Sequence, residues 1–144
     1  MPKKIPIIKH PGAVLIVPFI NNNEVVLLRQ FRRVIGKYLY ELPAGTLESK
    51  EQLVSCAKRE LIEEAGYSAG KLIRLGYIYP VPGYSTEKII IYKALNLKPA
   101  QKCLKDDEVI THSIVSKQKV RRLFKSGKIC DAKTICAFSL CGWL

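Results

Sequence analysis

Three glutamates, Glu60, Glu63 and Glu64, lie within five consecutive positions of this 144-residue chain. If this segment is helical, their i, i+3, i+4 spacing places the three carboxylates on one face of the helix. Late in a helix, these negative charges oppose the macrodipole, which favours cations at that end. Hard divalent ions with oxygen ligands, Mg²⁺ or Mn²⁺, would offset the charge. The spacing alone fits both a metal site and a solvated glutamate face.

The acidic residues are few but concentrated. The chain has 24 lysines and arginines against 12 acidic residues, a net charge of +12 that favours polyanionic partners such as nucleic acid, anionic membranes or small phosphorylated compounds. Nine of the twelve acids occupy two short stretches: Glu41, Glu48, Glu51, Glu60, Glu63 and Glu64, then Asp106, Asp107 and Glu108. If these stretches meet in space, their mutual repulsion favours a cation between them.

The segment that carries the three glutamates has the start and stop signals of a helix. Ser49 and Gln52 form a capping box, which predicts a helix over residues 50–65. Gly66 supplies the left-handed residue that commonly ends a helix. Apolar residues at helical spacing are expected to form its buried stripe, opposite the three glutamates: Leu53, Val54, Ala57, Leu61 and Ala65.

The other elements follow from β-branched runs and turn residues. Strands are expected at 13–20, 25–31, 39–41, 72–79, 88–97 and 109–115. A basic helix is expected at 117–125, and a last helix, capped by Asp131, at 132–142. This order predicts a mixed sheet flanked by helices, of the α+β class, in a single domain that spans residues 1–144.

The cysteines and the apolar runs bear on the compartment. Five cysteines without a C-x-x-C pair argue against a disulfide framework and a zinc site, and Cys56 and Cys136 are expected to be buried thiols. No apolar run is long enough to span a bilayer. We therefore expect a cytoplasmic protein that does not insert into membranes.

Residues 45–67 reproduce a known motif. Gly45, Glu51, the run Arg59-Glu60-Leu61-Ile62-Glu63-Glu64-Ala65-Gly66 and Tyr67 match G-x5-E-x7-R-E-U-x-E-E-x-G-U, where U is a bulky apolar residue. This pattern resembles the Nudix box, so the chain resembles the Nudix hydrolases. The resemblance implies an α/β/α sandwich with a mixed sheet and a loop-helix-loop catalytic motif. It also implies Mg²⁺-dependent, or Mn²⁺-dependent, hydrolysis of a nucleoside diphosphate linked to another moiety.

Further segments resemble the branch of the family that cleaves ADP-ribose and nucleoside diphosphate sugars. They are RQFR at 29–32, ELPAG at 41–45, Pro82, and GKICDAKT at 127–134. The similarity implies a small-molecule nucleoside diphosphate substrate. It favours hydrolysis of ADP-ribose to AMP and ribose 5-phosphate.

The resemblance also implies metal-binding and catalytic roles. The metal ligands would be the Ala44 carbonyl and the carboxylates of Glu60, Glu64 and Glu108. Arg59 would orient the box carboxylates, and Asp106 would be the general base. This branch more often has glutamate at the Asp106 position, so a box glutamate such as Glu63 stays open as the base.

On the substrate side, the RQFR and ELPAG segments imply roles for Arg29, Arg32 and Glu41. An arginine can clamp a phosphate bidentately. Pro82 lies 15 residues after Tyr67, near the place where the branch carries a marker proline, and Tyr84 could stack on a base or a ribose of the substrate. Tyr84 could equally pack on its own loop without touching the substrate. The arginines could equally be solvated surface residues.

Two features depart from the branch. Its enzymes typically begin with an added N-terminal sheet region that helps to form a dimer, but here only eleven residues precede Gly12, so a homodimer stays an open expectation. The predicted helix at 117–125 is strongly basic, which keeps nucleic acid in view. The alternatives are hydrolysis of an RNA 5′ pyrophosphate, hydrolysis of dinucleoside polyphosphates, and a non-catalytic nucleotide-binding regulator.

Overall fold

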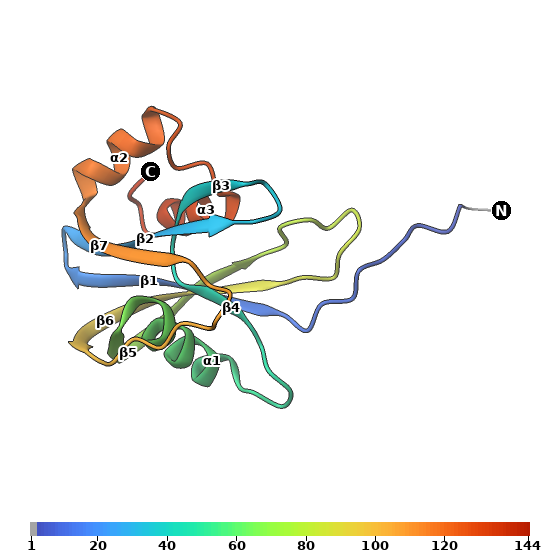
Figure 1. Ribbon diagram of the computed structural model, residues 1–144, viewed down its shortest axis with the longest axis horizontal. Helices are drawn as coiled ribbons and strands as arrows, with labels where there is room; N and C mark the ends of the chain where they lie inside the picture. The colour runs from blue at the N-terminus through green and yellow to red at the C-terminus, as the bar shows by residue number, and fades with distance from the viewer. Residues whose placement is uncertain (1–2) are drawn as a thin grey trace.

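A computed structural model of the protein describes residues 3–144. Over these residues the chain forms a seven-stranded mixed sheet with helices on both faces (Figure 1). The strands are β1 (Ala13–Asn21), β2 (Glu24–Arg32), β3 (Lys37–Glu41), β4 (Ala44–Thr46), β5 (Tyr67–Ile78), β6 (Ile89–Pro99) and β7 (Ile110–Ser116). The helices are α1 (Leu53–Glu60), which continues as the π-helical segment η1 (Leu61–Ala65), then α2 (Lys117–Lys125) and α3 (Ala132–Leu140).

Strand β1 is the centre of the sheet, whose main order is β3-β2-β1-β6-β5. It runs parallel to β6, with Val14 opposite Ile90, and antiparallel to β2 and β4. β4 pairs with the start of β1, where Leu15 lies opposite Ala44, while β7 pairs with β2. The short strand β4 is therefore fixed to the most buried strand of the protein.

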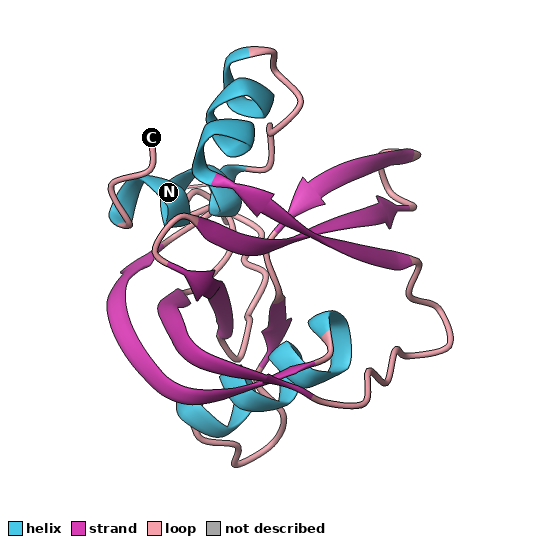
Figure 2. Ribbon diagram, turned by 90° about the vertical axis from the view of Figure 1, so that its left-hand side faces the viewer, coloured by secondary structure: helices cyan, strands magenta, loops and turns pink. Residues whose placement is uncertain are grey.

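Both faces of β1 are buried, which gives the protein two hydrophobic cores. Leu15 and Val17 point into the core that contains Phe138 of α3, whereas Val14 and Ile16 point into the core beneath α1. Figure 2 shows helices on opposite sides of the curved strands. This arrangement confirms the predicted α+β class and the α/β/α sandwich.

The predicted start of the first helix is wrong. Gln52 is the N-cap of α1, no side chain caps this end, and Ser49 lies before the helix. The Glu51 amide donates to the Glu48 carbonyl (3.0 Å), and the Glu48 amide donates to Oε2 of the Glu51 side chain (2.9 Å). Because these bonds close a turn before the helix, with Lys50 at φ +61°, the capping box does not form.

The burial around this helix also differs from the prediction. Val54, placed in the buried stripe, is 45% exposed, and Cys56 occupies the core in its place. Glu60 and Glu64 are buried, so of the two interpretations that their spacing allowed, a solvated glutamate face does not hold for them. The final turn is a π-helix instead of a regular α-helix, and Gly66 ends it with φ +72°, as predicted.

Other boundaries were predicted more closely. α2 has the predicted bounds, and Asp131 caps α3 by accepting a hydrogen bond from the Thr134 amide (3.2 Å). Two strand predictions were incomplete, since β4 was not foreseen and β5 begins at Tyr67 instead of residue 72. Cys56 is buried as predicted, but Cys136 is only half-buried. Within residues 3–144, no helix has the length and apolar character needed to cross a membrane.

Candidate active site

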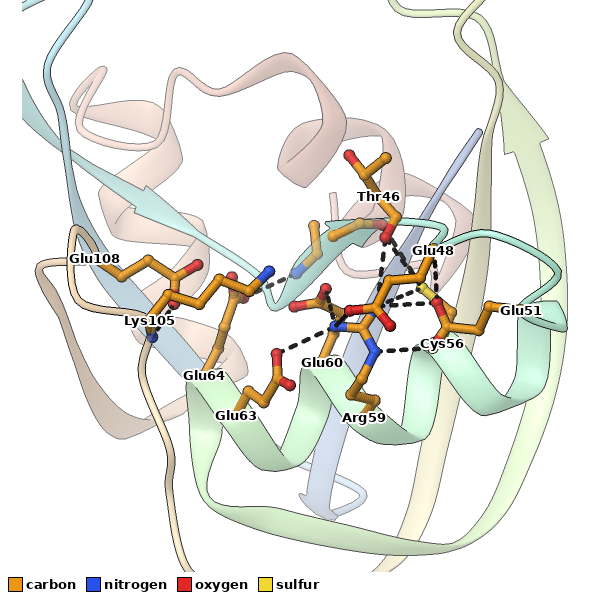
Figure 3. Close-up of polar contacts among 12 residues, drawn as sticks. Thr46, Glu48, Glu51, Cys56, Arg59, Glu60, Glu63, Glu64, Lys105 and Glu108 are labelled. Atoms are coloured by element: carbon orange, nitrogen blue, oxygen red, sulfur yellow. Dashed lines mark hydrogen bonds and ion pairs between the residues drawn. The ribbon is translucent and has the colours of Figure 1, made fainter. Parts of the chain in front are cut away.

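Arg59 is the centre of a carboxylate cluster at the end of α1. Its Nε lies 2.8 Å from Oε1 of Glu51, and its Nη1 lies 2.7 Å from Oε1 of Glu60 and 3.2 Å from Oε2 of Glu63 (Figure 3). The hydrogen bonds from Arg59 hold the pKa of Glu51 at about 2, and those bonds in turn raise the pKa of Arg59. One guanidinium thus fixes three carboxylates, including the predicted i, i+4 partner Glu63.

Glu60 and Glu64 are the buried members of this cluster, at 1% and 4% exposure. Burial raises the pKa of both carboxyls, that of Glu64 to about 8. The backbone amide of Ala44 donates to Oε2 of Glu64 (3.0 Å) and partly opposes this rise. The negative charges of Glu60 and Glu108 increase it further. Burial therefore disfavours the charged form of Glu64 more than the neighbouring carboxylates do.

The loop at 105–108 lies beside the same carboxylates. The Lys105 amide donates to Oε2 of Glu108 (3.0 Å), and the Glu108 amide donates to the Lys105 carbonyl (3.0 Å). Figure 3 shows Lys105 and Glu108 next to Glu64. Asp106 is exposed and makes no hydrogen bond or ion pair with any residue from 3 to 144. Lys105, whose positive charge acts on Glu60, was missed in the sequence because nothing separates it from other loop lysines.

The donor chemistry of the cluster fits a hard divalent ion. Carboxylate oxygens of Glu60, Glu64 and Glu108 are the ligand type that such ions prefer. Within the described part of the chain, no three His, Cys, Asp or Glu side chains already enclose a point where an ion could sit. Oε1 of Glu60 is turned to Arg59 and Oε2 of Glu64 to the Ala44 amide, so the carboxylates would have to reorient to share an ion.

A cavity of about 380 Å³ lies between β4 and the start of α3, and its wall includes Ala44 and Gly45, the backbone neighbours of the Glu64 and Glu60 carboxylates. We call it the β4–α3 cavity; Gly45, Arg32 and Lys133 contribute to its wall. Arg32 Nε donates to Oε1 of Glu41 (2.7 Å), which raises the pKa of Arg32, and Lys133 Nζ lies 3.0 Å from Oε2 of Glu41. Arg32 also borders a second cavity of about 410 Å³, whose wall includes Asp107 and Glu108.

A family model described as the NUDIX domain matches residues 9–138 of this sequence. The chain belongs to the Nudix hydrolase family. The arginine-centred carboxylate cluster described above is therefore formed by its Nudix box.

Several other proteins are similar to this sequence over most of its length. An ADP-ribose pyrophosphatase of Bacillus subtilis is 34% identical over 130 residues, which cover 89% of this chain and 70% of the relative. The methanol dehydrogenase activator of Bacillus methanolicus is 34% identical over 133 residues, covering 91% and 72%. A GDP-mannose pyrophosphatase of Escherichia coli is 30% identical over 135 residues, covering 86% and 69%.

The fold is also that of a solved structure, the crystal structure of an ADP compounds hydrolase. It superposes with a TM-score of 0.82 at 24% identity, over 91% of this chain and 70% of that chain. This likeness shows that the Nudix sandwich is preserved.

The structure separates the residues that were predicted to bind substrate. Arg32, which is bonded to Glu41, borders the β4–α3 cavity, but Arg29 lies 4.7 Å from the ring centre of Tyr38 and borders neither cavity. Pro82 and Tyr84 are exposed, and neither contributes to the cavity wall.

Sequence reasoning missed two residues at this Nudix cavity. Asp131 was predicted only as a helix cap, and no role was assigned to Lys133, yet both border the cavity. The GKICDAKT segment at 127–134 was the available signal, because it contains both residues.

Proposed function

We propose that this enzyme hydrolyses the pyrophosphate bond of a nucleoside diphosphate joined to a sugar. ADP-ribose is the first candidate, with AMP and ribose 5-phosphate as products. The observation that carries the proposal is that Ala44 and Gly45, which border the same cavity as Arg32 and Lys133, lie directly against buried Glu64 and Glu60. The names of the Bacillus subtilis and Escherichia coli relatives support a nucleotide-sugar substrate.

In this proposal a divalent ion, Mg²⁺ or Mn²⁺, is held by Glu60, Glu64, Glu108 and the Ala44 carbonyl. When bound, such an ion neutralises pyrophosphate oxygens and acidifies the attacking water. The residues of the chain then have separate tasks. Arg59 holds the box carboxylates in place, and Arg32 binds a phosphate oxygen.

The proton of the attacking water goes to a carboxylate in the same scheme. Asp106 is the proposed base, and Glu63 is the alternative because it lies in the cluster beside Arg59. The scheme assigns residues 1–144 to one Nudix domain. A cytoplasmic location and a homodimer stay predictions.

A turnover panel tests the substrate class. The purified protein is incubated with ADP-ribose, GDP-mannose, a diadenosine polyphosphate or 5′-triphosphorylated RNA, each with Mg²⁺ or with EDTA, and products are separated by chromatography. We expect cleavage of ADP-ribose or GDP-mannose in Mg²⁺ only. Faster cleavage of the RNA, or activity in EDTA, would contradict the proposal.

A single substitution tests the metal ligands. Glu64→Gln keeps the volume of the buried side chain but removes its charge, so we expect at least a hundred-fold loss of turnover with an unchanged circular dichroism spectrum. Glu24→Gln, in the β1–β2 hairpin, is the matched control and is expected to leave turnover unchanged. Normal turnover by Glu64→Gln would exclude Glu64 as a ligand.

A further inference from the structure

Helix α2 and the turn that follows it carry six cations and no acid. We call these residues the basic α2 face; they are Lys117, Lys119, Arg121, Arg122, Lys125 and Lys128. Five of them are exposed, and Lys117 is half-buried. Residues 109–130 contain no Asp or Glu. Among residues 3–144, none of the six cations forms an ion pair. Within the described chain, their positive charge therefore has no bonded counter-charge.

The two acids at the edges of this face are bonded to other groups. Glu24 lies opposite Ser116 in the sheet, but its Oε2 accepts a hydrogen bond from Nδ2 of Asn21 (2.7 Å). Asp131 forms an ion pair with Lys133 of α3 (2.9 Å). The positive charge of the basic α2 face is therefore available to a ligand.

The stability of the helix does not account for this row of cations. Lys117, Arg121 and Lys125 follow one another at intervals of four residues, so they lie along one side of α2. Like charges at this spacing repel one another and weaken a helix. Four residues advance a helix by about 6 Å, so the row presents positive charges at regular steps. Such a row suits a ligand whose negative charges also repeat along its length.

The apolar side of α2 is already packed into the protein. Val120 and Leu123 are buried in the core that contains Phe138 and Trp143. Nε of Arg121 donates to the Trp143 carbonyl (2.9 Å), which ties the helix to the turn after α3. A basic amphipathic helix binds a membrane by placing its apolar side in the lipid. Because that side of α2 is occupied, a nucleic acid suits this face better than a membrane.

Two cavities flank α2, and Arg121 borders both. The first, of about 380 Å³, includes Asn23 and Lys117 in its wall. The second, of about 310 Å³, includes Phe124 and Lys125. The Phe124 side chain is 39% exposed, although it is large and apolar. An exposed aromatic ring between two cations can stack on a base while the cations contact the adjoining phosphates.

The basic α2 face is separate from the catalytic cluster. Helix α2 packs into the core on one face of β1, whereas α1 packs into the core on the other face. Figures 1 and 2 both show α2 and α1 at opposite ends of the molecule. Among residues 3–144, the cavities beside α2 share no wall residue with the β4–α3 cavity. A ligand can therefore occupy this face without entering the active site.

We propose that the basic α2 face binds a single-stranded nucleic acid, whose phosphates contact the cations and one of whose bases stacks on Phe124. The inference goes beyond the proposed function, because it involves no cleavage and no residue of the carboxylate cluster.

The test measures binding of a labelled oligouridylate of about 20 nucleotides by fluorescence anisotropy in EDTA, at salt concentrations from about 50 to 200 mM. The oligonucleotide has a 5′ hydroxyl and therefore no pyrophosphate bond that the active site could hydrolyse. The variant Arg122→Gln/Lys125→Gln removes two charges from the basic α2 face. The matched control Lys71→Gln/Lys98→Gln removes two charges from exposed lysines of β5 and β6.

We expect the α2 double variant to bind at least tenfold more weakly than the wild type at the lowest salt. The plot of log K against log salt should also become shallower by about 1.4, since each phosphate contact to a single strand contributes about 0.7. The control should bind within threefold of the wild type. Equal losses in the two double variants would show that only net charge matters, which would overturn the inference.

Phe124 separates stacking from charge. Phe124→Ala should weaken binding at least fivefold without changing the salt dependence, and Phe124→Tyr should bind like the wild type. Circular dichroism checks that each variant keeps its fold. Unchanged affinity in a folded Phe124→Ala, or tighter binding of a duplex of the same length, would overturn the assignment to single strands.

Two further measurements complete the test. Vesicles that contain phosphatidylglycerol are the alternative polyanion, and α2-dependent binding to them without binding to the oligonucleotide would overturn the inference. ADP-ribose turnover of the α2 double variant should equal that of the wild type. Oligonucleotide binding by a protein that cleaves no nucleotide sugar would support the basic α2 face and contradict only the proposed function.

Discussion

The backbone of Gly45 lies against the carboxylate of Glu60, so closely that a Cβ at position 45 would overlap it. Gly45 cannot readily move away, because β4 is paired with the central strand and Gly45 lies opposite Val14. Glu60 is equally confined, since it is buried and bonded to Arg59. The missing side chain at Gly45 is therefore what makes room for the Glu60 carboxylate.

Gly45→Ala should disable the site without unfolding the protein. The new methyl group displaces the end of the Glu60 side chain, and a misplaced group of this kind costs on the order of a hundred-fold in kcat. Gly76→Ala is the control, because a Cβ there meets only Leu140 at an ordinary distance of 3.5 Å. Steady-state kinetics and circular dichroism are the measurements. Full activity in Gly45→Ala would show that the Glu60 position is unimportant.

Arg59→Met should destabilise the protein as well as inactivate it. Its removal leaves buried Glu60 without its ion-pair partner and frees Glu51 and Glu63. Breaking a buried pair typically costs about 3 kcal/mol. Urea denaturation measures the change in the free energy of unfolding, with Lys58→Met, an exposed residue of the same helix, as the control. Equal stability of the two variants would contradict the central role of Arg59.

Local signals in the sequence predicted those elements whose ends are fixed by local bonds. The bounds of α2, the Asp131 cap and the left-handed Gly66 were all predicted, because the residues that set each end lie within the segment itself. The start of α1 was predicted wrongly. Arg59 holds Glu51, eight positions earlier, and so stabilises a turn that competes with the capping box. Strand β4 was not predicted for a similar reason, because its pairing partner β1 is distant in the sequence.

In the candidate site, too, local features were predicted and features that depend on distant residues were not. The three box glutamates and Arg59 were found from spacing within one helix. The burial of these glutamates could not be predicted from that spacing. It depends on β4 and on the 105–108 loop, which come from elsewhere in the chain. Lys133 was missed since its partner Glu41 is 92 positions away.

Asp106→Asn tests the identity of the general base. Loss of a general base typically lowers kcat at least a hundred-fold, and we expect this loss with KM within threefold of the wild type. Asp107→Asn changes the neighbouring acid of the same turn and should retain activity. If Asp106→Asn is active and Glu63→Gln is not, the base is Glu63.

The rates at which the cysteines react with a thiol reagent should distinguish the exposed thiols from those buried near the site. Cys103 and Cys130 are exposed, whereas burial raises the pKa of Cys56 to about 12 and that of Cys141 to about 11. Because the thiolate is the reactive form, a disulfide reagent at pH 8 should modify the two exposed thiols at once. Cys103→Ser should remove one thiol from this fast phase, as counted by absorbance and located by mass spectrometry.

Cys56 should react only when α1 separates from β4. Its Sγ lies 3.9 Å from the Gly45 carbonyl and 3.8 Å from the Thr46 carbonyl, beneath the same backbone that contacts Glu60. Slow modification of Cys56 therefore measures local opening of the catalytic cluster. Mg²⁺ together with AMP should slow it further, because ligands that bind the closed site lower the population of the open state. Rapid modification of Cys56 in the folded protein would show that α1 and β4 are not held together as the Glu60–Gly45 contact requires.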